Sequence, residues 1–147
     1  MTLSAAVFDT NVLVSGILSP HGPPGWIVDA LQQGVCRAVV DDRIWAEYSE
    51  VLARPAFGFS TGDVELLLGR IAHYAVRAQV SFVSRYGIAL PDPDDLPFLA
   101  CAAAMDVPLV TGNVRHFPRA AIGQVDVMTP AVYMRRLQAD SARSEST

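Results

Sequence analysis

The chain of 147 residues has the size of one domain. Hydrophobic residues make up 51% of it and charged residues 18%, which is enough apolar material for a core and excludes a chain that is disordered throughout. The formal net charge of −4 argues against broad electrostatic adhesion to nucleic acid, and the absence of lysine excludes chemistry that needs one.

The N-terminal segment and the cysteines indicate where the protein works. The first apolar run reaches Asp9 without a basic region, unlike a signal peptide, and no apolar run is long enough for a membrane span. Cys36 and Cys101 stand alone in apolar surroundings, as reduced core cysteines do. We therefore expect a soluble, cytoplasmic protein.

Apolar periodicity and breaker residues predict strands that alternate with helices. Residues 19–25 contain a cluster of prolines and glycines, which predicts a turn or loop. Asp41 and Asp42 are N-cap candidates, and Thr129-Pro130 is a typical helix start. In chain order the predicted elements are a strand at 5–8, a helix at 11–18, a helix at 26–33, a strand at 36–40, a helix at 42–54, a helix at 61–75, a strand at 80–83, a helix at 96–105, strands at 108–111 and 125–128, and a helix at 131–137.

This alternation predicts a layered α/β fold around a mostly parallel sheet. The predicted domain spans residues 1–138, and the small polar residues 139–147 are expected to form a disordered tail. Ligands of such folds gather at the carboxyl ends of the strands. That rule selects residues 9–11, 41–42, 92–95 and 111–113, and three of these places are acidic.

The acidic positions are candidates for chemistry, and each has a plainer alternative. Asp9 can ligate a hard cation at a strand end, or it can cap the helix that follows. Glu47 is flanked by apolar helix residues and would be costly to bury without a partner, whereas a solvated helix face needs none. Asp92, Asp94 and Asp95 suit a helix N-terminus, although three carboxylates in four positions exceed what a cap requires.

Carboxylates brought together need a cation. Three of them within about 4 Å would repel each other by roughly 4 kcal/mol per pair at an effective dielectric constant near 20, unless a divalent ion holds them. Oxygen donors without a histidine or cysteine cluster favour Mg²⁺ or Mn²⁺ over zinc. His21, His73 and His116 lack metal-ligand spacing, so we expect surface or structural roles for them.

Four segments carry a family resemblance: VFDTNVLVS at 7–15, EYSEVLARP at 47–55, DPDDLPFLACA at 92–102 and LVTGNVRHFP at 109–118. Their order and spacing, within a stretch from about residue 5 to residue 137, resemble the PIN-domain family. Within that family the chain is most similar to the toxin component of bacterial toxin–antitoxin systems, akin to the VapC toxins.

The resemblance implies a three-layer α/β/α sandwich and a metal-dependent endoribonuclease that hydrolyses RNA phosphodiester bonds with Mg²⁺ or Mn²⁺, as the toxin of a type II pair. By motif position, Asp9, Glu47 and Asp95 would bind metal, with Asp92 as a helper. The family's fourth acidic position falls where this chain has Asn113. We therefore expect one metal to bind well and a second only with substrate phosphate, with Asn113 holding a metal-bound water.

Several polar residues are expected to position the substrate. Thr10 or Asn11 would orient Asp9 or the scissile phosphate, and Thr111 lies at the end of the fourth strand segment. Arg115 would dock a flanking phosphate, or it is an ordinary solvated arginine.

The implied partners are an RNA substrate, a cognate antitoxin and a second copy of the chain, with no membrane. Residues 26–28 and 57–59, together with Trp45, would line a groove for such a partner, or they belong to the core.

Two other functions stay open at this stage. A catalytically weak or inactive PIN-like module that binds RNA or protein is favoured by Asn113. An aspartate-nucleophile phosphatase would need a second aspartate where Asn11 stands, and a lysine.

Overall fold

The structure is a computed structural model that describes residues 4–79, 90 and 92–145. Within these residues the strands form one five-stranded sheet in the order β3-β2-β1-β4-β5, and every neighbouring pair is parallel. Ala5 of β1 pairs with Arg37 of β2, and Val7 pairs with Leu109 of β4. The strands are β1 (Ala5–Phe8), β2 (Arg37–Val40), β3 (Val76–Arg77), β4 (Leu109–Val110) and β5 (Val127–Met128).

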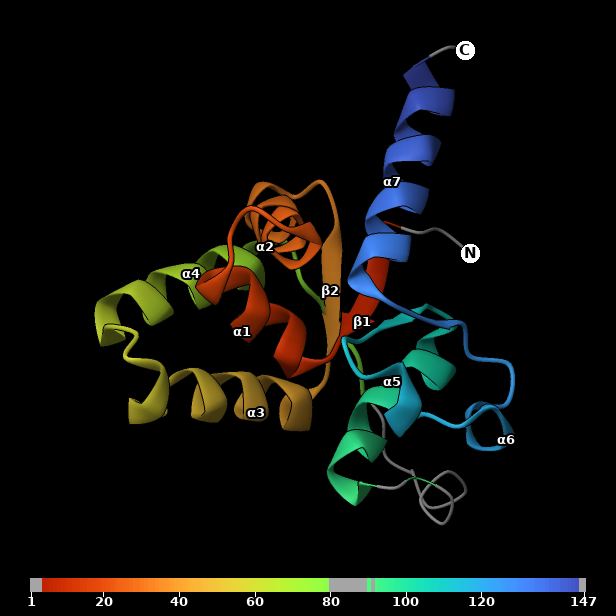
Figure 1. The fold of residues 1–147 in the computed structure, drawn as a ribbon, viewed down its shortest axis with the longest axis horizontal. Coiled ribbons are helices and arrows are strands. Elements are labelled where there is room, and N and C mark those ends of the chain that lie inside the picture. Colours follow the sequence, from red (N-terminus) through yellow and green to blue (C-terminus); the bar gives the residue numbers. More distant parts are fainter. Residues whose placement is uncertain (1–3, 80–89, 91, 146–147) are drawn as a thin grey trace.

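Helices cover both sides of the sheet. In Figure 1, β1 and β2 pass between α1, α2, α3 and α4 on one side and α5 on the other. This confirms the predicted α/β/α sandwich. The helices are α1 (Thr10–Leu18), α2 (Pro23–Gln33), α3 (Asp42–Leu52), α4 (Thr61–Tyr74), α5 (Leu96–Met105), α6 (Arg119–Ile122) and α7 (Pro130–Glu145), with short 3₁₀ turns η1 (Pro55–Phe57), η3 (Pro93–Asp95) and η4 (Val114–His116).

The central strands are buried on both faces, as parallel strands covered by helices must be. Residues 6–8 of β1 and 38–40 of β2 are at most 1% exposed. The hydroxyl of Tyr48 in α3 donates a hydrogen bond to the carbonyl of Phe8, which ties the end of β1 to that helix inside the core. Cys36 and Cys101 are free and buried, as the sequence predicts.

Several predicted helix boundaries are confirmed by their caps. The side chain of Asp41 accepts a hydrogen bond from the Ile44 amide at the start of α3. Gly34 ends α2 with a φ of 76°, a conformation that glycine adopts without steric cost. At the start of α7, the Thr129 hydroxyl oxygen accepts a hydrogen bond from the Val132 amide.

The main differences from the predicted elements concern α2, the third strand and α7. Helix α2 begins at Pro23, inside the cluster expected to be a loop, because the missing N–H of proline costs nothing in a first turn. The third strand is residues 76–77, while the predicted strand at 80–83 lies outside the described residues. Helix α7 continues through residue 145, past the expected end at 137, and Arg143 pairs with Asp140 within that extension.

The strand order creates a switch point at β1. The chain builds the sheet from β1 outward to β2 and β3, then crosses back to place β4 and β5 on the other side of β1. In open α/β sheets, the crevice at the carboxyl ends of the strands next to such a reversal is where ligands bind. Among the described residues, no helix has the length and apolar character needed to cross a membrane.

Candidate functional site

Asp9 and Thr111 meet across the switch point. They follow β1 and β4 directly, and the backbone pairing continues to their amides, which donate to the carbonyls of Val110 and Met128. The Thr111 hydroxyl, fully buried, donates to Oδ2 of Asp9 over 2.8 Å. The end of β4 therefore holds the Asp9 carboxylate at the end of β1.

Asp9 is buried without a basic partner. Its residue is 7% exposed, and among the described residues its side chain forms no ion pair. The Asn11 amide donates to Oδ2 over 3.3 Å, and Oδ1 of Asn11 accepts from the amide of Gly112 over 3.2 Å. Burial raises the pKa of Asp9, while the Thr111 hydroxyl and the backbone amides of Thr10 and Asn11 oppose that rise. Asp9 is thus a carboxylate held in place by neutral donors.

Glu47 reaches the same edge from α3. Its side chain is half-buried and accepts a hydrogen bond from the Thr10 hydroxyl, in the first turn of α1. Partial burial raises the pKa of Glu47, and the charges of Asp9 and Asp94 add to that rise. The inward position of Glu47, rather than the solvated alternative, is the one that the structure shows.

Asp95 approaches from the junction of η3 and α5. Its residue is 8% exposed, and Oδ2 lies 3.1 Å from Nδ1 of His116 in η4. The pKa of Asp95 rises from 3.8 to about 6 because of burial and the charges of Asp9 and Asp92, while His116 lowers it. The negative charge of Asp9 therefore adds to the pKa rise of Asp95, as it does for Glu47.

Other acidic residues near this edge have structural roles. Asp92 accepts a hydrogen bond from the Asp94 amide over 3.0 Å and so caps η3. Asp41 caps α3 and pairs with Arg43 over 3.2 Å, and Glu50 is exposed and pairs with Arg54. Asp9, Glu47 and Asp95 have no such structural role, so they are the candidates for chemistry, and Asp92 is a candidate helper in addition to its capping role.

A family comparison bears on what this edge can do. The family model described as "PIN domain" matches residues 5–115, which is most of the chain and includes all three of these acids. The chain belongs to the PIN-domain family. No curated protein matches the sequence closely enough to count as a relative. PIN domains are generally nucleases that use divalent metals, so the acidic edge of this PIN domain is its candidate active site.

The donor set of this PIN domain fits a hard divalent cation. It consists of carboxylate oxygens whose charge is opposed by burial and by one another, and a cation relieves both costs. The three acids are close enough for the charge of Asp9 to raise the pKa of Glu47 and of Asp95. In the described part of the chain, however, no group of three His, Cys, Asp or Glu side chains is placed so that it could hold an ion. Metal binding would therefore require these side chains to turn toward a common point.

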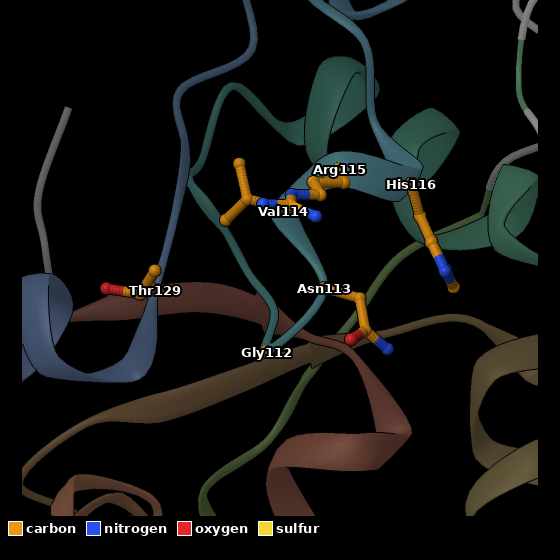
Figure 2. A pocket seen from close by; sticks show the side chains of 6 residues that line it. All are labelled: Gly112, Asn113, Val114, Arg115, His116 and Thr129. Carbon is orange, nitrogen blue, oxygen red and sulfur yellow. The ribbon is translucent and has the colours of Figure 1, made fainter.

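The residues after β4 form the less acidic side of the edge. The backbone amide of Asn113 donates to the Thr111 hydroxyl oxygen over 3.0 Å, and Asn113 is one of the residues that line a pocket of about 420 Å³. Figure 2 shows the Asn113 and His116 side chains projecting to the same side of the loop that follows β4, with Thr129 on the other side of that loop. The pocket lining is Gly112, Asn113, Val114, Arg115, His116 and Thr129.

Sequence reasoning did not identify His116 or Tyr48 as site residues. His116 was expected to be surface or structural, yet it contacts the Asp95 carboxylate and lines the pocket. Its separation from Asp95 is 21 residues, so no local spacing could have revealed the contact. Tyr48 adjoins Glu47 in the sequence, and only the fold shows that it anchors the strand end before Asp9.

Proposed function

We propose that this PIN domain is a metal-dependent endoribonuclease that hydrolyses RNA phosphodiester bonds, and that it is the toxin of a bacterial type II toxin–antitoxin pair. The observation that carries the proposal is the set of three acids at the sheet's switch point: burial raises the pKa of each, and the charge of Asp9 adds to the rise at Glu47 and Asp95. Such a set is costly for a protein to maintain unless a cation uses it.

Asp9, Glu47 and Asp95 would hold Mg²⁺ or Mn²⁺, and Asp92 would assist from its more exposed position. A divalent cation at that place supplies Lewis acidity for water activation and neutralises charge on the phosphate. Hydrolysis of this kind needs no nucleophilic side chain.

The remaining residues orient these acids or the RNA. Thr111 and Asn11 hold Asp9 through its Oδ2, and Thr10 holds Glu47. Each donor keeps its carboxylate at the sheet edge, from which the carboxylate would turn toward a bound cation. Asn113 and Arg115, whose side chains are exposed beside the acids, would contact substrate.

The toxin role implies a cognate antitoxin, a homodimer and a cytoplasmic site of action. The apolar groove considered for a partner has limited support, because Ile27 and Val28 belong to the core and Trp26, Trp45 and Phe59 pack against it.

The test is cleavage of single-stranded and structured RNA with Mg²⁺, Mn²⁺ or EDTA, comparing wild type with Asp9→Asn and with Glu50→Gln. Glu50 is an exposed glutamate on the same helix as Glu47, so its variant controls for loss of a carboxylate. We expect metal-dependent cleavage that Asp9→Asn abolishes and Glu50→Gln retains. Cleavage that survives Asp9→Asn, or no cleavage with either metal, would contradict the proposal.

The second candidate is a PIN-like binding module without activity. It is favoured by Asn113 and by the lack of a ready-made group of three metal-ligating side chains in the described residues. The two candidates differ in metal binding: an active enzyme should melt at a higher temperature in Mn²⁺, and Asp9→Asn should remove that rise. A vestigial site should show no rise.

A further inference from the structure

We infer that the pocket at the carboxyl ends of β4 and β5 is a nucleotide subsite, which takes the phosphate of a nucleotide at Arg115 and its base at Asn113. The inference rests on the proposed function, because it places an RNA nucleotide next to the acids that would cleave the adjoining phosphodiester. It adds a binding site with its own ligand and its own test.

The position of the pocket joins it to the acidic edge. Asn113 and Thr129 lie just beyond β4 and β5, and His116 both lines the pocket and contacts Asp95. A nucleotide seated there would therefore lie one side chain away from Asp95. The volume, about 420 Å³, falls at the lower end of the range of about 300–1,000 Å³ for small-molecule sites.

The chemistry of the lining suits an anion with a polar ring. Among the described residues, no carboxylate lines this pocket, although three acids lie at the same sheet edge and the chain as a whole carries a net charge of −4. Arg115 is the one arginine among the described residues of the lining. The pocket thus provides a local place where RNA phosphate meets no repelling carboxylate.

Arg115 differs from most arginines of the described residues because it has no partner among them. The paired arginines and their partners are Arg37 with the Tyr74 carbonyl, Arg43 with Asp41, Arg54 with Glu50, Arg70 with Gln32, Arg77 with Asp42, Arg136 with Asp126 and Arg143 with Asp140. A free guanidinium beside a pocket can form two parallel hydrogen bonds to a phosphate.

The Asn113 side chain provides the complementary contact. Its amide has no hydrogen-bond partner among the described residues, and it offers a donor and an acceptor side by side. A base edge that presents the same pair, as adenine does, is the group that asparagine binds with two hydrogen bonds. Phosphate and base are therefore both required for full affinity.

The first experiment is a titration of AMP, adenosine and inorganic phosphate into the metal-free protein in EDTA, followed by amide NMR shifts. We expect AMP to change the amide chemical shifts of residues 112–116 and to bind more tightly than adenosine or phosphate. Arg115→Gln should weaken AMP binding about tenfold. Arg70→Gln, which removes the same charge from α4, should leave the affinity unchanged.

AMP that binds no more tightly than inorganic phosphate would overturn the inference and leave only an anion site. Equal losses of AMP affinity in Arg115→Gln and Arg70→Gln would overturn the inference as well, and so would the absence of binding at millimolar AMP. Asn113→Leu should weaken AMP but leave phosphate unchanged, and a loss of both would contradict the assigned division of roles.

The second experiment measures binding of a short single-stranded RNA in EDTA at several salt concentrations. The logarithm of the binding constant falls linearly with the logarithm of the salt concentration. Loss of one phosphate contact should make this slope less negative by about 0.7 in Arg115→Gln and should not change it in Arg70→Gln. An unchanged slope would contradict a phosphate contact at Arg115. Neither experiment needs metal or cleavage. A protein that binds AMP but cleaves no RNA would refute only the proposed nuclease activity. A protein that cleaves RNA but does not bind AMP would refute only the proposed subsite.

Discussion

At the scale of single residues, the acidic edge places three buried or half-buried carboxylates near one another, and His116 is the basic side chain that contacts one of them, Asp95. Asp9 is held by hydroxyl and amide donors, and its charge acts on both Glu47 and Asp95. Such an arrangement opposes folding when all three are ionised, because burial and mutual repulsion both penalise the charged forms. The same residues that would bind a cation therefore lower the stability of the metal-free protein.

This conflict predicts that Asp9→Asn stabilises the metal-free protein by about 1–2 kcal/mol at pH 7.5. The asparagine oxygen can still accept from Thr111, while the buried charge is removed. Thermal melting in EDTA measures the effect, and Glu50→Gln serves as the control because Glu50 is exposed. A lower melting temperature for Asp9→Asn would show that the charge itself is stabilising.

The raised pKa of Asp95 predicts a pH dependence of stability with a definite sign. Between pH 3.8 and about 6, the folded protein keeps a proton on Asp95 that the unfolded chain has lost. Stability therefore falls as pH rises through this window, by up to about 3 kcal/mol, and levels off above it.

Denaturant unfolding of wild type and Asp95→Asn from pH 4 to pH 7 tests this dependence. The variant should gain stability relative to wild type as pH rises to about 6 and keep a constant advantage above it. A difference that is independent of pH would mean that Asp95 titrates alike in the folded and unfolded chains.

At the scale of secondary-structure elements, α1 and α2 pack closely where α1 carries a glycine. A Cβ on Gly16 would lie 2.6 Å from the Pro24 carbonyl oxygen and 2.5 Å from Cγ2 of Val28. A backbone atom cannot move aside as a flexible side chain can, so the spacing of α1 and α2 depends on this glycine. Helix α1, which carries this glycine, also positions Thr10 and Asn11 beside the acids.

Gly16→Ala should therefore destabilise the protein by about 2 kcal/mol or more. Gly69→Ala in α4 is the matched substitution, because a Cβ there meets nothing within 4 Å, and it should stabilise by about 0.5–1 kcal/mol. Chemical denaturation of both variants measures the two signs. If both variants gained stability, the close approach of α1 and α2 would not constrain the fold.

At the scale of the whole molecule, α7 begins in the core and ends outside it. Tyr133 and Leu137 are buried, whereas residues 138–143 are mostly exposed (Figure 1). The family match covers residues 5–115, so the C-terminal helix lies beyond it. We propose that the folded domain ends near residue 138, although the helix itself continues.

A chain that ends at Gln138 should keep its melting temperature within about 2 °C of the full chain, because the removed turns bury little surface. Leu137→Ala is the contrasting change and should cost about 2 kcal/mol or more, since the side chain is 5% exposed. A large loss on truncation would place the domain boundary farther along α7.

The edge that carries the site could be predicted from the sequence because parallel strands end on the same side of a sheet. Asp9 follows an apolar run, and Thr111 follows another, so both belong at that edge whatever the strand order. Helix caps at Asp41 and Thr129 follow equally from local chemistry. A two-residue strand such as β3 has no periodicity to detect, and it exists only through its pairing with β2.

By itself, the sequence determined the alternation of strands and helices, the two buried cysteines and the sheet edge where the acids belong. These depend on apolar periodicity and on the local preferences of proline, glycine and aspartate. The tertiary structure alone decided that Thr111 holds Asp9 over a separation of 102 residues, that Thr10 holds Glu47, and that His116 meets Asp95. Those contacts depend on strand order and on the rotation of each helix, which are set by the packing of the whole core and not by any local segment.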